Sequence, residues 1–217
     1  MRSLKWMAGT FALIVGLVAA GSGVAHAAEP GKKGAPRFTQ SGVGDALVRV
    51  PKAYKPIVIT ATHDGQANFI VEGVGKDGEA SSLLVNTIGP YSGTVYEGMG
   101  LFSGFTKKNP MVALSIRADG PWTIRTKPLA AAPKKSAKSG QGTASAVIKL
   151  RKKTRGLTKG TFTHQGESNF IVYALDTKGT ADLLVNEIGP YKGSVRVPSG
   201  TRYLSITAEG PWTYRMR

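Results

Sequence analysis

Two histidines and two tryptophans recur at matching positions in two similar sequence blocks, and these residue types can do chemistry. His63 lies in Thr-His-Asp-Gly-Gln-Ala-Asn-Phe-Ile-Val and His164 in Thr-His-Gln-Gly-Glu-Ser-Asn-Phe-Ile-Val, while Trp122 and Trp212 each follow Gly-Pro and precede Thr. Histidine is a common general base and metal ligand. These pairs therefore raise the question of a duplicated active site.

The two copies argue against catalysis and metal binding. A base and its orienting acid should occur together in each copy, yet Asp64 beside His63 is replaced by Gln165 beside His164, and only Asp119 and Glu209 keep a carboxylate. Zinc sites need three or four His, Cys or acidic ligands, and calcium sites need clustered oxygens. We therefore predict a non-enzymatic protein without catalytic, cofactor-binding or metal-binding residues.

The repeated polar residues have two interpretations. Each His-x-Gly-x-x-Asn string predicts a turn between two strands, which the His and Asn side chains would support by hydrogen bonds. Contact with a ligand at the loop end is the alternative. The candidate residues for such contact are His63, Asn68, Tyr91, His164, Asn169 and Tyr191.

Two further motifs recur. Leu-Leu-Val-Asn-x-Ile-Gly-Pro-Tyr-x-Gly occurs from Leu83 and again from Leu183, and it predicts a strand with little solvent on either face, followed by a turn. The Gly-Pro-Trp-Thr motif predicts a new strand beginning at its proline. We expect Trp122 and Trp212 to fill the core, with a role as exposed aromatic platforms as the alternative.

Each copy predicts an all-β fold. Short β-branched and aromatic runs are separated by Gly, Pro, Asn or Asp every 8 to 12 residues, and no sustained helical period occurs. The expected strands of the second copy are residues 144–150, 157–164, 169–175, 183–188, 193–197, 203–208 and 212–216. This pattern predicts two tandem small β-sandwich modules with jelly-roll or Greek-key connections. A small barrel is the alternative.

The composition of the chain suggests its domain boundaries. Arg2 and Lys5 precede an apolar run, and Ala-His-Ala follows it, so residues 1–27 resemble a secretory signal peptide and 28–36 a flexible arm. We expect module 1 at 37–126, a basic linker at 127–142 and module 2 at 143–217. The expected location is extracellular or cell-envelope associated, with no transmembrane anchor after processing.

The first copy carries ten extra residues within 97–110, a stretch that contains Met99, Leu101, Phe102 and Phe105. These side chains either form a contact surface on an exposed loop or fold back over the sandwich.

Positive charge is concentrated in the middle of the chain. Without Arg2 and Lys5, 27 basic and 13 acidic residues remain, a net charge of +14, and no acidic residue lies between Asp119 and Glu167. Polyanions are the natural partners of such a surface. The candidate contacts are Lys149, Arg151, Lys152, Lys153 and Arg155. No nucleic-acid-binding motif is present, so we expect no specific nucleic acid.

The three repeated motifs resemble small secreted all-β tandem repeat modules of actinobacteria, which have no established activity. The resemblance covers both copies and implies an extracellular, non-enzymatic role. The first hypothesis is thus a secreted protein that binds anionic cell-envelope polymers or polysaccharide through its basic surface. The alternatives are a protein-interaction module, such as an inhibitor or accessory factor of a secreted enzyme, and a carbohydrate-binding module.

Overall fold

The computed structural model describes residues 37–53, 56–98 and 105–217, and this part of the chain is almost entirely β-structure. It contains fifteen strands and one short 3₁₀ helix, η1 (Leu129–Ala131). The predicted signal peptide and arm, together with Met99, Leu101 and Phe102, lie outside the described residues.

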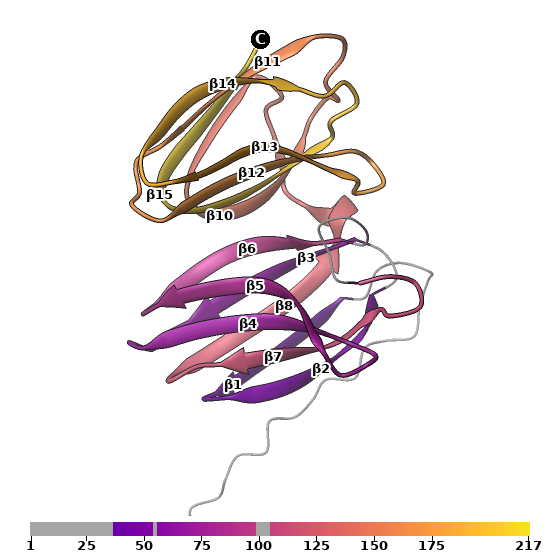
Figure 1. The fold of residues 1–217 in the computed structure, drawn as a ribbon, viewed down its shortest axis with the longest axis vertical. Coiled ribbons are helices and arrows are strands. Elements are labelled where there is room, and N and C mark those ends of the chain that lie inside the picture. The colour runs from indigo at the N-terminus through magenta and orange to yellow at the C-terminus, as the bar shows by residue number, and fades with distance from the viewer. Residues whose placement is uncertain (1–36, 54–55, 99–104) are drawn as a thin grey trace, which may run out of the picture.

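The first copy forms a sandwich of two four-stranded antiparallel sheets (Figure 1). One sheet has the order β1-β8-β3-β6 and the other β2-β7-β4-β5. The strands are β1 (Phe38–Val43), β2 (Ala46–Ala53), β3 (Ile57–His63), β4 (Asn68–Gly75), β5 (Ala80–Ile88), β6 (Tyr91–Glu97), β7 (Met111–Arg117) and β8 (Pro121–Pro128). Alternate side chains of both sheets, such as Ile59, Phe69 and Ile124, meet in one buried core.

The second copy repeats this pattern of pairing, with two strands that each run through both layers. Its strands are β9 (Lys134–Lys135), β10 (Ser139–Leu150), β11 (Thr158–His164), β12 (Asn169–Leu175), β13 (Ala181–Ile188), β14 (Tyr191–Val197) and β15 (Tyr203–Met216), of which β10 and β15 are the two shared by both layers. The first part of β10 pairs with the end of β15, as β1 pairs with β8, and its last part pairs with the start of β15, as β2 pairs with β7. β15 also pairs with β11 and with β12, so the two layers share continuous strands.

The strand order of the first copy is that of a jelly roll, in which two Greek keys wind around one core. The all-β sandwich prediction is therefore confirmed. Gly210, with φ of 104°, lets β15 turn from one layer to the other without ending. The sequence predicted two strands here, at 203–208 and 212–216, whereas the structure has one.

The segment predicted as a linker, residues 127–142, is mostly part of the fold. β8 extends to Pro128, β9 and β10 take up Lys134–Lys135 and the chain from Ser139, and Leu129 and Ala132 are buried. The boundary of the second sandwich thus lies before residue 143. Low apolar content hid these strands, because β9 and the start of β10 are held by backbone pairing and not by buried side chains.

One expectation about apolar residues needs correction, and one alternative is decided. The Leu-Leu-Val strand is not covered on both faces, because Leu83 and Leu183 are 61% and 45% exposed on β5 and β13, each at the end of its sheet's strand order. Within the inserted loop of the first copy, Phe105 is buried at 1% exposure in the core of the first sandwich. For Phe105, the alternative in which the loop folds back over the sandwich is therefore confirmed.

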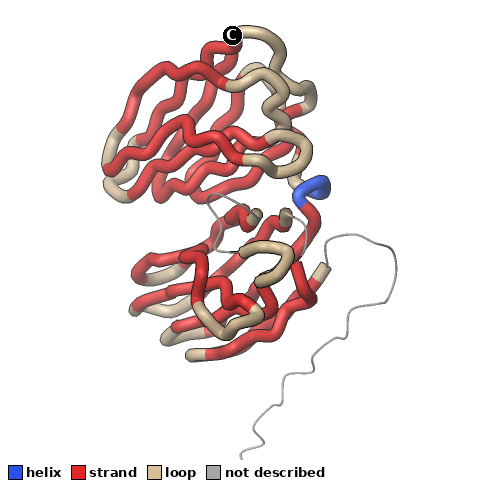
Figure 2. Tube along the Cα trace, turned by 45° about the vertical axis from the view of Figure 1, so that its right-hand side comes forward, coloured by secondary structure: helices blue, strands red, loops and turns tan. Residues whose placement is uncertain are grey.

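A third apolar cluster joins the two sandwiches. It contains Val58 from β3, Leu129 from η1, and Val147, Leu175 and Tyr203 from the second copy. The Tyr96 hydroxyl donates a hydrogen bond of 2.5 Å to the Gly179 carbonyl oxygen across the junction. β6 lies beside β10, and η1 forms the turn between the sandwiches (Figures 1 and 2).

Candidate functional site

The three repeated motifs meet at one end of each sandwich. In the first copy, His63 ends β3 and its Nδ1 lies 3.0 Å from the Gly89 carbonyl oxygen of the second motif. The Asp64 amide donates to the Pro121 carbonyl of the third motif at 2.9 Å. The imidazole stacks on Phe69 at 4.5 Å between ring centroids with an interplanar angle of 6°. We call this arrangement the motif cluster.

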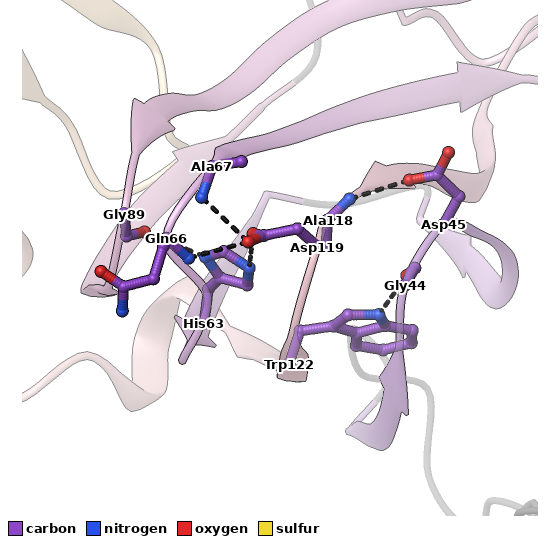
Figure 3. Close-up of polar contacts among 9 residues, drawn as sticks. All are labelled: Gly44, Asp45, His63, Gln66, Ala67, Gly89, Ala118, Asp119 and Trp122. Carbon is purple, nitrogen blue, oxygen red and sulfur yellow. Dashed lines mark hydrogen bonds and ion pairs between the residues drawn. The ribbon is translucent and has the colours of Figure 1, made fainter.

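Asp119 completes the motif cluster of the first copy (Figure 3). Its carboxylate accepts hydrogen bonds from the Gln66 and Ala67 amides at 2.8 and 2.9 Å, and its other oxygen lies 3.2 Å from His63 Nε2. The Gln66 amide, then the Ala67 amide, and to a smaller extent His63, lower the pKa of Asp119 below its ordinary value. The carboxylate therefore closes the turn after β3 in its ionised form.

The second copy builds the same motif cluster without a carboxylate. His164 Nδ1 lies 2.9 Å from the Gly189 carbonyl oxygen, and its Nε2 lies 3.0 Å from the backbone carbonyl of Glu209. The ring stacks on Phe170 at 4.7 Å. The backbone carbonyl of Glu209 thus takes the place of the Asp119 carboxylate. What the two histidines share is that each connects the turn after its own strand to the turn of the second motif.

Close contacts leave no room for a Cβ at the glycines of the repeated motifs. A Cβ added to Gly65 would collide with the Asp119 carboxylate and the His63 ring, and one added to Gly166 with the Glu209 carbonyl oxygen and the His164 ring. The rings of Tyr91 and Tyr191 likewise cover the glycines two residues further along, Gly93 and Gly193. This close approach explains why Gly is fixed at these places in both copies.

Both tryptophans belong to the core, as predicted. Trp122 and Trp212 are each 3% exposed. Trp122 Nε1 donates to the Gly44 carbonyl oxygen at 2.8 Å, and Trp212 Nε1 donates to the Ala144 carbonyl oxygen at the same distance. Neither indole is thus an exposed platform for a sugar ring.

The candidate ligand residues of the motifs do not converge on one open concavity. His63 and His164 are buried, Tyr91 and Tyr191 are half-buried, and Asn68 and Asn169 are exposed at the starts of β4 and β12. The Tyr91 hydroxyl hydrogen-bonds to Ser145 of the second sandwich, and burial raises the pKa of this tyrosine. Tyr91 therefore contributes to the junction as well as to the motif cluster.

The predicted basic contacts fall into two groups. Arg151, Lys152, Lys153 and Arg155 are exposed in the loop after β10, and residues 151–155 are called the basic loop below. Lys149 differs, because its Nζ donates to the Ala130 carbonyl oxygen at 3.1 Å and lies 5.7 Å from the centre of the Tyr203 ring. Lys149 is therefore already engaged at the junction.

Sequence reasoning missed a second basic surface, on the outer side of the layer formed by β14, β11 and the ends of β15 and β10. Five exposed cations lie on it: Lys159, Lys192, Arg196, Arg215 and Arg217. We call these five residues the cationic face. They are spread over 59 positions of the sequence, so only the strand register brings them together. Their alternation with buried residues along each strand is the signal that could have revealed them.

No group of three or more His, Cys, Asp or Glu side chains that could hold a metal ion occurs among residues 37–53, 56–98 and 105–217. In the same part of the chain, no helix has the length and apolar character needed to cross a membrane.

Comparisons with known proteins identify no family. No protein-family model matches the chain, and no curated protein matches it. Among solved structures, a candidate α-L-fucosidase from Bacteroides ovatus is 12% identical with a TM-score of 0.26, and the match covers 82% of this chain and 36% of that one. The chain therefore spans about a third of that protein's length.

Two other solved structures are similarly distant. A single-residue variant of the Bacillus subtilis oxalate decarboxylase is 10% identical with a TM-score of 0.21, over 85% of this chain and 73% of that one. A candidate secreted protein from Parabacteroides distasonis is 8% identical with a TM-score of 0.21, over 85% and 89% of the two chains. At these scores the likenesses carry no argument about function.

Proposed function

We propose that the protein is a secreted, non-enzymatic binding protein that associates with anionic cell-envelope polymers through basic surfaces of its second sandwich. The observation that carries this proposal is the absence of acidic residues from 120 to 166, together with the exposure of the basic loop within that segment. None of the basic loop's side chains forms a salt bridge with a carboxylate in the described residues. These charges are free to bind anions.

The site chemistry supports binding over catalysis. The imidazole of each histidine contacts a backbone carbonyl and stacks on a phenyl ring. The Asp119 carboxylate accepts hydrogen bonds from two backbone amides. A catalytic base must reach a substrate proton, and a nucleophile needs such a base beside it. Neither arrangement is formed by the motif clusters.

Retention of the full chain on an immobilised anionic polymer, as salt is raised, tests the proposal. Replacing Arg151, Lys152, Lys153 and Arg155 by Gln should move elution to lower salt, because each lost cation removes one electrostatic contact. Lys149 is left unchanged, since its ammonium group is bonded at the junction.

A matched control removes four exposed cations of the first sandwich, Arg49, Lys76, Lys107 and Lys108, also by substitution with Gln. Equal elution shifts for the two variants would reduce the effect to net charge alone. Failure of the wild-type protein to bind any anionic polymer at low salt would refute the proposed function.

A further inference from the structure

The outer layer of the second sandwich arranges its polar side chains in rows across four strands. Each row takes one residue from β14, β11, β15 and β10, in that order. The first row consists of Lys192, Thr163, Thr213 and Gln141, and the next row consists of Ser194, Thr161, Arg215 and Ser139. Arg196, Lys159 and Arg217 follow at the end of the layer. Every one of these side chains points away from the core, because the residues between them are buried or half-buried.

The cationic face has no built-in counterions. Neither β11 nor β14 contains Asp or Glu, and the part of β15 that pairs with β11 has none, since Glu209 lies six residues before Arg215. None of the five side chains forms a salt bridge in the described residues. Lys159 and Arg196 are direct cross-strand partners, a pairing of like charges that destabilises a sheet. A bound anion would relieve this repulsion.

Hydroxyl groups line the space between the cations. Thr161, Thr163 and Thr213 lie with Lys159, Lys192 and Arg215 around one shallow depression. The Thr161 and Ser194 hydroxyls are 2.8 Å apart, and those of Thr163 and Thr213 are 2.6 Å apart. Cross-strand bonds of this kind fix the depression's floor. In each pair one hydroxyl donates to the other, so the second hydroxyl keeps its hydrogen to donate to an anion's oxygen.

The first sandwich has a similar pattern of hydroxyls but lacks three of the five cations. Thr60 and Thr94 take the places of Thr161 and Ser194, and their hydroxyls lie 3.2 Å apart. Arg125 and Lys127 keep the charges of Arg215 and Arg217, and Ser92 stands at the place of Lys192. At the places of Lys159 and Arg196 stand Val58 and Tyr96, which pair across β3 and β6 and pack against the second sandwich. This end of the equivalent surface is therefore used for the junction. The cationic face itself lies on the far side of the second sandwich, at the top of Figure 1.

We propose that the cationic face is the docking surface for a linear polyol-phosphate polymer, whose phosphates bind the cations and hydroxyls of successive rows. This inference rests on the proposed function and specifies its site and ligand. Rows lie two residues apart along each strand, or about 6.6 to 6.8 Å, a distance that a short polyol between phosphates can span. Arg215 and Arg217 offer guanidinium forks that match phosphate oxygens.

The chemistry of the face favours this polymer over two others. Its aromatic neighbours Phe162, Trp212 and Tyr214 all point into the core, so no exposed ring is present to stack on sugars. For the same reason, the bases of a nucleic acid find no stacking partner. A flexible chain of phosphates needs neither.

The test measures binding of purified poly(glycerol phosphate) to the full chain by calorimetry at several salt concentrations. The first variant carries Lys159→Gln, Lys192→Ser and Arg196→Gln, in which Ser is the residue that the first copy has at the equivalent position, Ser92. The matched control carries Lys76→Gln, Lys107→Gln and Lys108→Gln on the first sandwich, with the same change in charge. A basic-loop variant with Lys152→Gln, Lys153→Gln and Arg155→Gln is measured beside it. Thermal unfolding of each variant confirms that the fold is retained.

We expect the first variant to lose about tenfold or more in affinity. The slope of log affinity against log salt should flatten by roughly 3, about one per contact removed. The control should lose less than a third of that slope. If the basic-loop variant loses more than the first variant, the basic loop is the site and the inference fails, while the proposed function stands. If the wild type binds none of the polymers, both fail. Equal or tighter binding of polygalacturonate or duplex DNA at matched charge would refute the polyol-phosphate assignment.

Discussion

At the scale of single residues, each histidine connects parts of the chain that are distant in the sequence. His63 contacts the Gly89 carbonyl, the Phe69 ring and, in the first copy alone, the Asp119 carboxylate. His164 reaches the Glu209 backbone in place of a carboxylate. The third motif can thus carry Asp119 in one copy and Glu209 in the other, because the histidine contacts the carboxylate only in the first copy.

This difference predicts a pH dependence from Asp119 that the matching position of the second copy lacks. The folded-state pKa of Asp119 is lowered, so its ionised form adds stability that is fully present above the unfolded value of about 3.9 and is lost as pH falls through the lower folded pKa. Asp119→Asn should therefore reduce stability at neutral pH and flatten its decline between about pH 5 and pH 2. Urea unfolding at a series of pH values measures both effects.

The control for Asp119→Asn is Glu209→Gln, because His164 contacts the backbone oxygen of Glu209 and not its carboxylate. This variant should follow the wild-type curve. Identical pH profiles for all three proteins would show that the Asp119 carboxylate does not stabilise the fold.

At the scale of elements, the insertion of the first copy is in part a core element. Phe105 is 1% exposed and belongs to the same cluster as Val71 and Leu114. Its ring also lies where a Cβ on Gly73 would stand, so strand β4 is shaped to receive it. The second copy has no equivalent residue, and Ala174, which is 1% exposed in the second core, stands on β12 at the place of Gly73.

Phe105→Ala should lower the free energy of unfolding by about 3 to 5 kcal/mol, since it leaves a cavity between the sheets. Chemical denaturation measures this loss. The neighbouring exposed residue supplies the comparison, and Lys107→Ala should change stability by less than about 0.5 kcal/mol. A small effect of Phe105→Ala would mean that the loop is dispensable for the fold.

At the scale of the whole molecule, the two sandwiches share a buried junction. Val58 and Leu129 from the first copy and its connection pack with Leu175 and Tyr203 of the second. Burial raises the pKa of Tyr96, whose hydroxyl bonds across the junction. Each sandwich is small for its surface, so contact with the other contributes to the stability of both.

Leu129→Ala should therefore destabilise the protein by about 2 to 5 kcal/mol and weaken the coupling between the sandwiches. Differential scanning calorimetry checks this, with a lower midpoint and a broadened or divided transition expected in place of the wild-type profile. Ala130→Ser, at the adjacent exposed position, is the matched change that should leave the profile intact. An unchanged profile for Leu129→Ala would show that the sandwiches unfold independently.

The repeated all-β architecture could be predicted from the sequence, because alternation and turn residues are local signals that are present in both copies. The sequence also assigned Trp122 and Trp212 to the core and argued that the acids do not accompany the histidines as a catalytic set would require. The burial of Leu129 and the strands within residues 127–142 were not predicted, since backbone pairing with distant strands holds them.

Tertiary structure alone decided which polar residues meet. His63 and Asp119 are 56 positions apart and come together because two turns pack against each other. Lys159, Arg196 and Arg217 become neighbours only through the register of β11, β14 and β15. Local sequence patterns specify strands and the face on which each side chain lies, whereas the pairing of distant strands specifies the surface that those side chains form.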